Sequence, residues 1–164
     1  MFKPTVKINR ITDITPELLG DMDIDTLLLD VDNTLSTFKG ESFVDGFEQW
    51  RDDMLSRGIK LRILSNAKTH RLNAFAKRAG IEGTGMALKP LPFGYFRAAR
   101  QCGSKIKNTA VVGDQIFTDI LGGSLAGVKT FLVEPILLEK EWSFRFKRRL
   151  ERLLLKKYGM SDGR

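Results

Sequence analysis

Short apolar runs alternate with amphipathic segments along most of this chain. The runs have the length and continuity of buried strands, and they predict five strands, at 26–31, 59–64, 83–88, 109–112 and 128–133. Apolar residues recur at helical spacing between them, which predicts four helices, at 43–57, 68–79, 92–102 and 115–125. Strands that alternate with helices in this way form a parallel sheet. We therefore expect an α/β fold with helices on both faces of the sheet.

Local signals define where several helices begin and end. Thr15, Pro16 and Glu17 have the residue types of an N-cap, a first helical position and a first turn, so they predict a further helix start. In the segment 43–57, we expect Phe43, Phe47, Trp50 and Leu55 to form the buried side. Gly58 directly follows that segment and predicts its end.

Composition is that of a folded protein with no covalent cross-link of its own. Hydrophobic residues make up 42% and charged residues 29% of 164 residues, and the single cysteine, Cys102, has no partner for an internal disulfide. No signal peptide is recognisable at the start, and no apolar run approaches the roughly 18 residues that a membrane span needs. We therefore expect a cytoplasmic protein, either free or peripheral on the inner face of the membrane.

Positive charge is concentrated near the C-terminus. The net charge is +7, and the segment 137–164 carries nine Lys or Arg against four acids, so the other residues taken together are close to balanced. Drawn as a helix, 141–158 places Trp142 on an apolar stripe beside a basic stripe, which is typical of an interfacial helix. We predict a catalytic domain at 1–136 and a basic amphipathic tail at 137–164, whose membrane contacts would come from Trp142, Arg145, Arg148, Arg149, Arg152 and Lys156.

Two other roles for this tail stay open. Its apolar stripe would also suit packing on the domain, with the basic face solvated. A nucleic-acid face is the third reading, but no aromatic platform or recognised nucleic-acid module supports it.

Polar side chains follow four of the predicted strands at the point where each strand ends. They are Asp30, Asp32, Asn33 and Thr34 after the first, Ser65 and Asn66 after the second, Lys89 after the third, and Asp114 and Asp119 after the fourth. The carboxyl ends of parallel strands meet at one edge, so these groups come together there. Aspartates so close repel one another unless a cation lies among them, and Mg²⁺ prefers oxygen ligands of this kind.

This order of motifs resembles the haloacid dehalogenase superfamily, over about 25–133. The carrying residues are Asp30-Val31-Asp32-Asn33-Thr34, Ser65, Lys89, and Gly113-Asp114 with Asp119. The resemblance implies a Rossmann-like fold and a Mg²⁺-dependent phosphatase that works through an aspartyl-phosphate. It also implies roles for individual residues. Asp30 would be the nucleophile, Asp32 the general acid and base, and Ser65 and Lys89 catalytic groups that contact the phosphoryl oxygens, with Thr34 and Asn66 beside them.

The same resemblance implies how the metal is held. The Asp30 carboxylate, the backbone carbonyl of Asp32 and Asp114 would be ligands, and Asp119 would lie close by or act through water. Members of this superfamily often carry a cap domain inserted after the first or second motif. The intervals from Asp30 to Ser65 and from Ser65 to Lys89 leave no room for one. We therefore expect no cap domain and an open rim, which suits a phosphate carried by something large.

Finer details are similar to the bacterial YqeG-type family. They are Ile14 to Leu18, Leu29 to Leu35, Leu64 to Asn66, Lys89-Pro90 and Gly113 to Asp119, and the likeness then extends over about 12–157. That family is similar to the phosphatidylglycerophosphate phosphatases of mitochondria and plastids. This implies that the substrate is phosphatidylglycerophosphate, an anionic lipid, and that the product is phosphatidylglycerol.

Two alternatives remain. A soluble phosphatase acting on a nucleotide, a sugar or a macromolecular phosphate would use the same motifs. A non-catalytic adaptor would use only the basic tail, but a binding module has no need of Asp32 and Lys89 at these positions.

Overall fold

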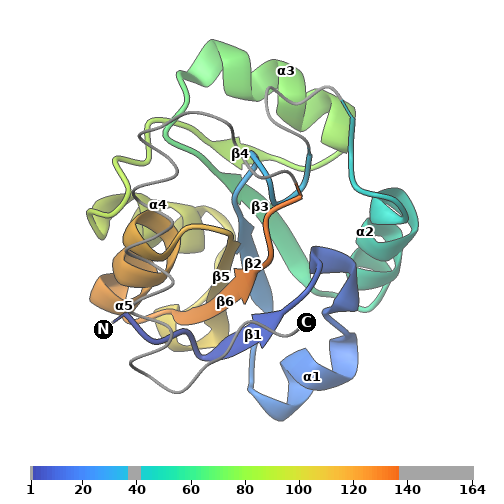
Figure 1. The fold of residues 1–164 in the computed structure, drawn as a ribbon, viewed down its shortest axis with the longest axis horizontal. Coiled ribbons are helices and arrows are strands. Elements are labelled where there is room, and N and C mark those ends of the chain that lie inside the picture. Colours follow the sequence, from blue (N-terminus) through green and yellow to red (C-terminus); the bar gives the residue numbers. More distant parts are fainter. Residues whose placement is uncertain (1, 37–41, 137–164) are drawn as a thin grey trace.

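The computed structural model describes residues 2–36 and 42–136. Its six strands are β1 (Val6–Ile8), β2 (Thr26–Leu29), β3 (Lys60–Leu64), β4 (Gly83–Thr84), β5 (Thr109–Gly113) and β6 (Lys129–Val133). They form one sheet in the order β1-β6-β5-β2-β3-β4, and every pairing is parallel. The predicted α/β class is therefore confirmed. β2 lies inside the sheet, between β5 and β3 (Figure 1).

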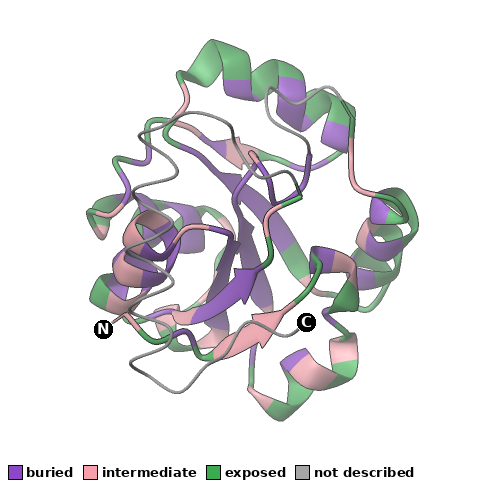
Figure 2. Cartoon of the chain, viewed as in Figure 1, coloured by how far each residue is buried: buried purple, intermediate pink, exposed green. Residues whose placement is uncertain are grey.

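Helices cover both faces of this sheet (Figure 1). They are α1 (Pro16–Asp21), α2 (Phe47–Ser56), α3 (Thr69–Ala79), α4 (Phe93–Gln101) and α5 (Leu121–Ala126). Successive residues of a strand point to opposite faces. Leu27 and Leu29 accordingly pack in the core beneath α1, α2 and α3, and Leu28 packs in a second core beneath α4 and α5. Figure 2 shows the central strands buried between these layers.

The first strand of the structure was not predicted. β1 is a three-residue edge strand whose residues are all half-buried, so it shows no apolar run. It exists because Val6, Lys7 and Ile8 pair in parallel register with Phe131, Leu132 and Val133 of β6. The predicted strand at 83–88 is also shorter, because only Gly83 and Thr84 pair with β3.

Two of the predicted helices differ in their bounds. The helix expected at 43–57 begins at Phe47, after Gly46 in a left-handed conformation (φ +79°). Phe47, Trp50 and Met54 form its buried side, whereas Leu55 is exposed, so the prediction of Leu55 as a core residue was wrong. The helix expected at 115–125 is a π-helical turn over Ile116–Ile120 followed by α5.

The predicted start of α1 is confirmed in atomic detail. Pro16 is the first helical residue, and the Thr15 hydroxyl accepts a hydrogen bond of 3.2 Å from the Leu18 N–H. Among the described residues, the intervals between the motifs hold only the elements that the sheet needs, and no inserted cap domain is present. In 2–36 and 42–136, no helix combines the length and hydropathy that crossing a bilayer requires.

Candidate active site

Three parallel strands deliver the candidate residues to one edge. Leu29 of β2 lies in register with Ile63 of β3 and Val112 of β5, so the residues after each strand reach the same level of the sheet. The Asp30 N–H extends this pairing by donating to the Val112 carbonyl at 2.9 Å. Asp30 therefore lies at the middle of the edge.

Lys89 links two of the predicted acids. Its Nζ lies 2.7 Å from Asp30 Oδ1 and 2.7 Å from Asp119 Oδ1, and all three residues are buried. Lys89 comes from the loop after β4, and Asp119 comes from the turn after β5. The Lys89 side chain therefore crosses the carboxyl end of β2, from the β3 and β4 flank of the sheet to the β5 flank.

Burial and charge act in opposite directions on this group. Burial alone lowers the pKa of the Lys89 ammonium, but Asp119 and Asp30 more than offset this, so its pKa lies above the usual value. Burial raises the pKa of Asp119 to about 6, although Lys89 acts to lower it. The two carboxylates therefore stabilise the charged form of Lys89, and Asp119 is a weaker acid than an exposed aspartate.

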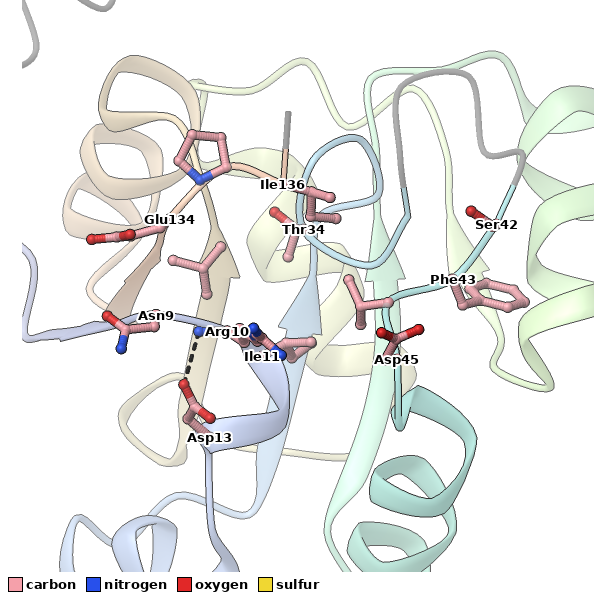
Figure 3. A pocket seen from close by; sticks show the side chains of 13 residues that line it. Asn9, Arg10, Ile11, Asp13, Thr34, Ser42, Phe43, Asp45, Glu134 and Ile136 are labelled. Carbon is pink, nitrogen blue, oxygen red and sulfur yellow. Dashed lines mark hydrogen bonds between the residues drawn. The ribbon is translucent and has the colours of Figure 1, made fainter. Parts of the chain in front are cut away.

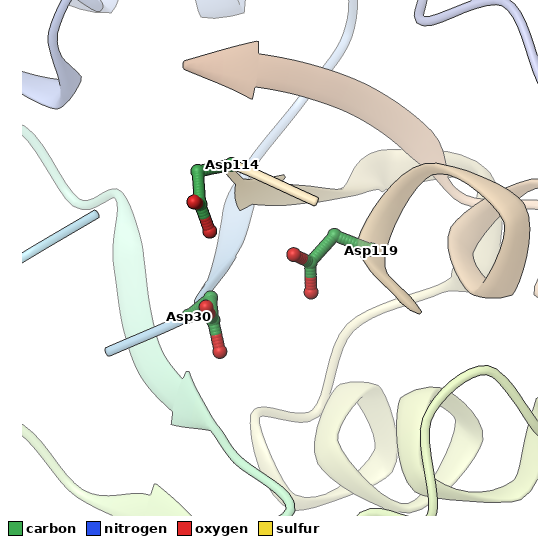
Figure 4. A group of neighbouring side chains, drawn as sticks. All are labelled: Asp30, Asp114 and Asp119. Carbon is green, nitrogen blue, oxygen red and sulfur yellow. The ribbon is translucent and has the colours of Figure 1, made fainter. Parts of the chain in front are cut away.

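Three carboxylates lie close enough to share a cation. One oxygen each of Asp30, Asp114 and Asp119 lies within 4.8 Å of the other two, and all three residues are buried. Figure 4 shows their side chains converging from β2, β5 and the turn that leads into α5. The three carboxylates carry more negative charge than the Lys89 ammonium offsets, and all of their ligand atoms are oxygens. Such a cluster fits Mg²⁺. The predicted fourth ligand, the Asp32 carbonyl, stays a prediction.

Glycines allow this close packing. A side chain at Gly113 would collide with the Asp119 carboxylate, so the residue before Asp114 cannot carry a Cβ without moving Asp119. The π-helical turn then fixes Asp119, whose N–H donates to the Gln115 carbonyl at 2.9 Å. Gly122 leaves room in the same way for the Tyr95 ring.

Sequence reasoning did not identify Tyr95 as part of this region. Its hydroxyl donates a hydrogen bond of 2.7 Å to the Thr118 carbonyl, and its ring is fully buried beneath the site. Burial and the nearby Asp119 carboxylate raise its pKa. No local motif marks Tyr95. Gly122 is the sequence feature that relates to Tyr95, because it leaves room for the ring. That relation can be recognised only once α4 and α5 are known to be in contact.

Asn66 holds the loop that carries Lys89. Its Oδ1 accepts from the Lys89 N–H at 2.7 Å, and its Nδ2 donates to the Lys89 carbonyl at 3.1 Å. This pairing orients the lysine backbone, and the predicted contact of Asn66 with phosphate stays a prediction. Ser65 is buried, and its Oγ accepts from the Ala67 N–H at 3.1 Å, so its hydroxyl proton is still available for donation.

The turn after Asp30 separates two cavities of different charge. The larger, about 920 Å³, includes Thr34, Asp13, Asp45 and Glu134 in its lining, with Arg10 as the one basic residue among the described residues that line it (Figure 3). The smaller, about 140 Å³, lies on the other side of the turn, and its polar and charged lining residues are Asp32, Ser65, Arg71 and Arg78. The smaller cavity therefore suits an anion better than the larger one.

Thr34 lies in the tight turn between these cavities. It is buried, and within the described part of the chain its hydroxyl has no hydrogen-bond partner. Asn33 before it has a left-handed backbone (φ +59°), and the Asn33 carbonyl accepts from the Ile136 N–H at 3.4 Å. The turn is thereby tied to the end of the described chain. The tail residues Trp142, Arg145, Arg148, Arg149, Arg152 and Lys156 lie outside the described residues.

Known proteins are similar to this chain in sequence. Residues 41–127 match the family model of haloacid dehalogenase-like hydrolases. The chain is 34% identical over 154 residues to the probable phosphatase YqeG of Bacillus subtilis, an alignment that covers 94% of this chain and 90% of that protein. The segment that the family model matches begins after Asp30, so that match does not include the first motif.

Solved structures share the fold at low sequence identity. The cobalt-bound deoxy-D-mannose-octulosonate 8-phosphate phosphatase of Haemophilus influenzae is 18% identical with a TM-score of 0.54, covering 84% of this chain and 91% of that one. The corresponding phosphatase of Moraxella catarrhalis, in complex with magnesium, phosphate and KDO, is 15% identical with a TM-score of 0.50, covering 87% and 92%. Both confirm the Rossmann-like architecture.

Proposed function

Because this chain belongs to the haloacid dehalogenase-like hydrolase family, in which it is a YqeG-type phosphatase, we propose that it removes the terminal phosphate of phosphatidylglycerophosphate in a Mg²⁺-dependent reaction. The observation that carries the chemistry is the buried cluster of Asp30, Asp114 and Asp119, in which Lys89 bridges Asp30 and Asp119. The lipid substrate rests on the resemblance of YqeG-type sequences to phosphatidylglycerophosphate phosphatases.

Asp30 acts as the nucleophile in this proposal. One of its carboxylate oxygens attacks phosphorus, the bond from phosphorus to the leaving alkoxide breaks, and an aspartyl-phosphate forms. Asp32 donates a proton to the alkoxide as it leaves. Asp32 then takes a proton from a water molecule that attacks the same phosphorus, which releases inorganic phosphate and restores Asp30.

Side chains around Asp30 hold the phosphoryl group during both steps. The Lys89 ammonium, 2.7 Å from Asp30 Oδ1, lies where negative charge accumulates on the transferred group. The Ser65 hydroxyl donates to a phosphoryl oxygen, with Thr34 and Asn66 beside it. Asp30, Asp114, Asp119 and the Asp32 carbonyl would hold Mg²⁺, which, when bound, offsets the charge of the phosphate.

The remaining parts of the proposal concern location. Residues 1–136 form the catalytic domain, and 137–164 form a basic tail that contacts the inner face of the membrane. The absence of an inserted cap domain among the described residues supports a substrate whose phosphate is presented at a surface. Nine Lys or Arg in 137–164 support attraction to anionic lipid.

Phosphate release tests the proposal. Wild-type protein is assayed with Mg²⁺ on phosphatidylglycerophosphate dispersed in detergent and on a panel of soluble phosphomonoesters, with Asp30→Asn as the inactive control. We expect a clear preference for the lipid. Equal or better turnover of a soluble ester would retain the phosphatase chemistry and replace the lipid with that class of substrate.

A further inference from the structure

Five large apolar side chains are exposed on the loop between β4 and α4 and on the first turn of α4. They are Met86, Leu88, Leu91, Phe93 and Phe96, and each is between 43% and 69% exposed. We call this set the apolar loop patch. Exposed apolar residues gathered along one segment mark an interaction site more often than scattered ones do.

The patch borders the catalytic lysine. Residues along the loop alternate, so that Ala87 and Lys89 are buried whereas Met86 and Leu88 are exposed. Figure 2 shows this exposed loop between β4 and α4. Because Lys89 must point inward to reach Asp30 and Asp119, its neighbour Leu88 is directed outward at the rim of the site.

The loop has a defined backbone despite its exposed side chains. Met86 (φ +48°) and Leu88 (φ +55°) both adopt the left-handed conformation, which costs about 1 kcal/mol or more for such residues. Their exposed side chains do not offset this cost by burial. Two hydrogen bonds stabilise the loop instead. The Met86 N–H donates to the Ala67 carbonyl at 2.9 Å, and the Arg97 guanidinium donates to the Met86 carbonyl at 3.3 Å.

Exposed basic side chains lie next to the patch. Arg97 follows Phe96 on α4 and donates to the carbonyls of Gly85 and Met86. Lys68 lies beside the loop, since it precedes α3 and follows Ala67, to which Met86 is bonded. Apolar and aromatic side chains combined with basic neighbours match the interface of an anionic bilayer, in which the former enter the acyl region and the latter meet the headgroups.

We propose that the apolar loop patch docks on an anionic lipid bilayer and turns the Lys89 side of the active site towards the membrane. Phe93 and Leu91 enter the headgroup boundary, and Lys68 and Arg97 contact lipid phosphates. The biological purpose of this docking rests on the proposed lipid substrate. The surface is distinct from the basic tail, because it lies within the catalytic domain.

Vesicle co-sedimentation of the full chain tests this surface. Wild-type protein should bind phosphatidylcholine vesicles only when they contain phosphatidylglycerol, and salt should weaken the binding. Phe93→Asp should weaken the binding at least about tenfold, because the variant loses an aromatic side chain that the bilayer would bury. Lys68→Ala should weaken it about fivefold.

A matched control lies on the opposite flank. Leu55→Asp makes the same kind of change at an exposed apolar residue of α2, where the neighbours Asp52 and Asp53 are acidic. Binding of that variant should stay within about twofold of wild type. Circular dichroism melting of both variants confirms that each is folded.

Two results would overturn the proposal. If Phe93→Asp binds vesicles like wild type, another part of the chain provides the contact. If sedimentation velocity shows a wild-type dimer that Phe93→Asp dissociates, the patch is an interface between copies of this chain. Turnover of detergent-dispersed lipid is a separate test: turnover without vesicle binding removes only the docking surface, and vesicle binding without turnover removes only the lipid substrate.

Discussion

The side chains on the two sides of β2 differ in charge at the carboxyl end of the strand. On the β5 side lie Asp114 and Asp119, whose oxygens approach Asp30 closely enough to share a cation. On the β3 and β4 side lie Ser65, whose hydroxyl proton is available for donation, and Lys89, which carries positive charge. The proposed nucleophile, Asp30, therefore lies between a proposed metal side and a proposed phosphate side. In this proposal, the substrate phosphate approaches from the β3 and β4 side.

Charge also differs between two stretches of the sequence. Residues 60–108 hold eleven basic residues and one acid, whereas 1–59 hold six basic residues and twelve acids. The two cavities beside the site repeat this contrast, since the one beside Ser65 contains Arg71 and Arg78 and the one beside Thr34 contains mainly acids. The Arg71 and Arg78 side chains therefore favour an anion in the cavity beside Ser65.

Removing the central group should disable both sides at once. Asp30→Asn keeps the size of the side chain but removes the attacking carboxylate, so we expect turnover to fall by about 10⁴-fold or more. Phosphate release under saturating Mg²⁺ measures this. Asp21→Asn, on the exposed surface of α1, is the matched control and should retain full activity. Substantial activity in Asp30→Asn would assign the nucleophile to another residue.

Loss of activity from a change on the phosphate side should not be reversed by added Mg²⁺. Lys89→Met removes the ammonium but keeps an unbranched side chain, and we expect turnover to fall about 10²- to 10³-fold, as for loss of one group that stabilises transition-state charge. Raising Mg²⁺ should not restore it. Lys105→Met changes an exposed lysine that precedes β5, at the other end of that strand from Asp114, and should have no effect. Recovery of Lys89→Met at high Mg²⁺ would instead place Lys89 on the metal side.

The metal side should show the reverse behaviour. Asp114→Asn weakens a proposed ligand, so activity at low Mg²⁺ should fall at least the roughly 10- to 100-fold that loss of an outer-shell partner costs a metal site. Raising Mg²⁺ should recover part of it by mass action. A titration of activity against Mg²⁺ for both variants distinguishes the two sides. Identical Mg²⁺ dependence of Asp114→Asn and wild type would exclude Asp114 as a ligand.

A smaller effect should follow from loss of one hydroxyl. Ser65→Ala removes a single proposed hydrogen bond to a phosphoryl oxygen, worth about 1.5 kcal/mol, so turnover should fall about tenfold. Ser56→Ala, at the exposed end of α2, provides the control. If Ser65→Ala retains full activity, the hydroxyl only caps the Ala67 N–H, as it does in the structure.

Much of the fold could be predicted because the central strands are buried on both faces. Leu27, Leu28 and Leu29 form an uninterrupted apolar run for that reason. β1 could not be predicted, since it is half-buried and depends on pairing with Phe131, which is distant in sequence. The assignment of Leu55 to the core failed because the helix begins at Phe47, and helical spacing from there buries Trp50 and Met54.

The candidate site could be predicted as a set of residues but not as a set of contacts. Asp30 and Asp114 are conspicuous because each directly follows an apolar strand, and Lys89 because it follows the run that is predicted as a strand at 83–88. The ion pair between Lys89 and Asp119 depends on close packing that Gly113 permits, and such contacts arise only in the folded chain. The charge contrast was present in the sequence, but the near balance of 1–136 as a whole concealed it.

The sheet ends on both sides in very short strands. β1 has three residues and β4 has two, although both lie at the edges, where backbone groups face no further strand among residues 2–36 and 42–136. Exposed edges of this kind are templates for pairing with other chains, and short ones limit aggregation. A protein gathered at high local concentration on a surface would benefit most from this protection. The brevity of β1 and β4 therefore reduces the tendency of neighbouring copies to assemble edge to edge.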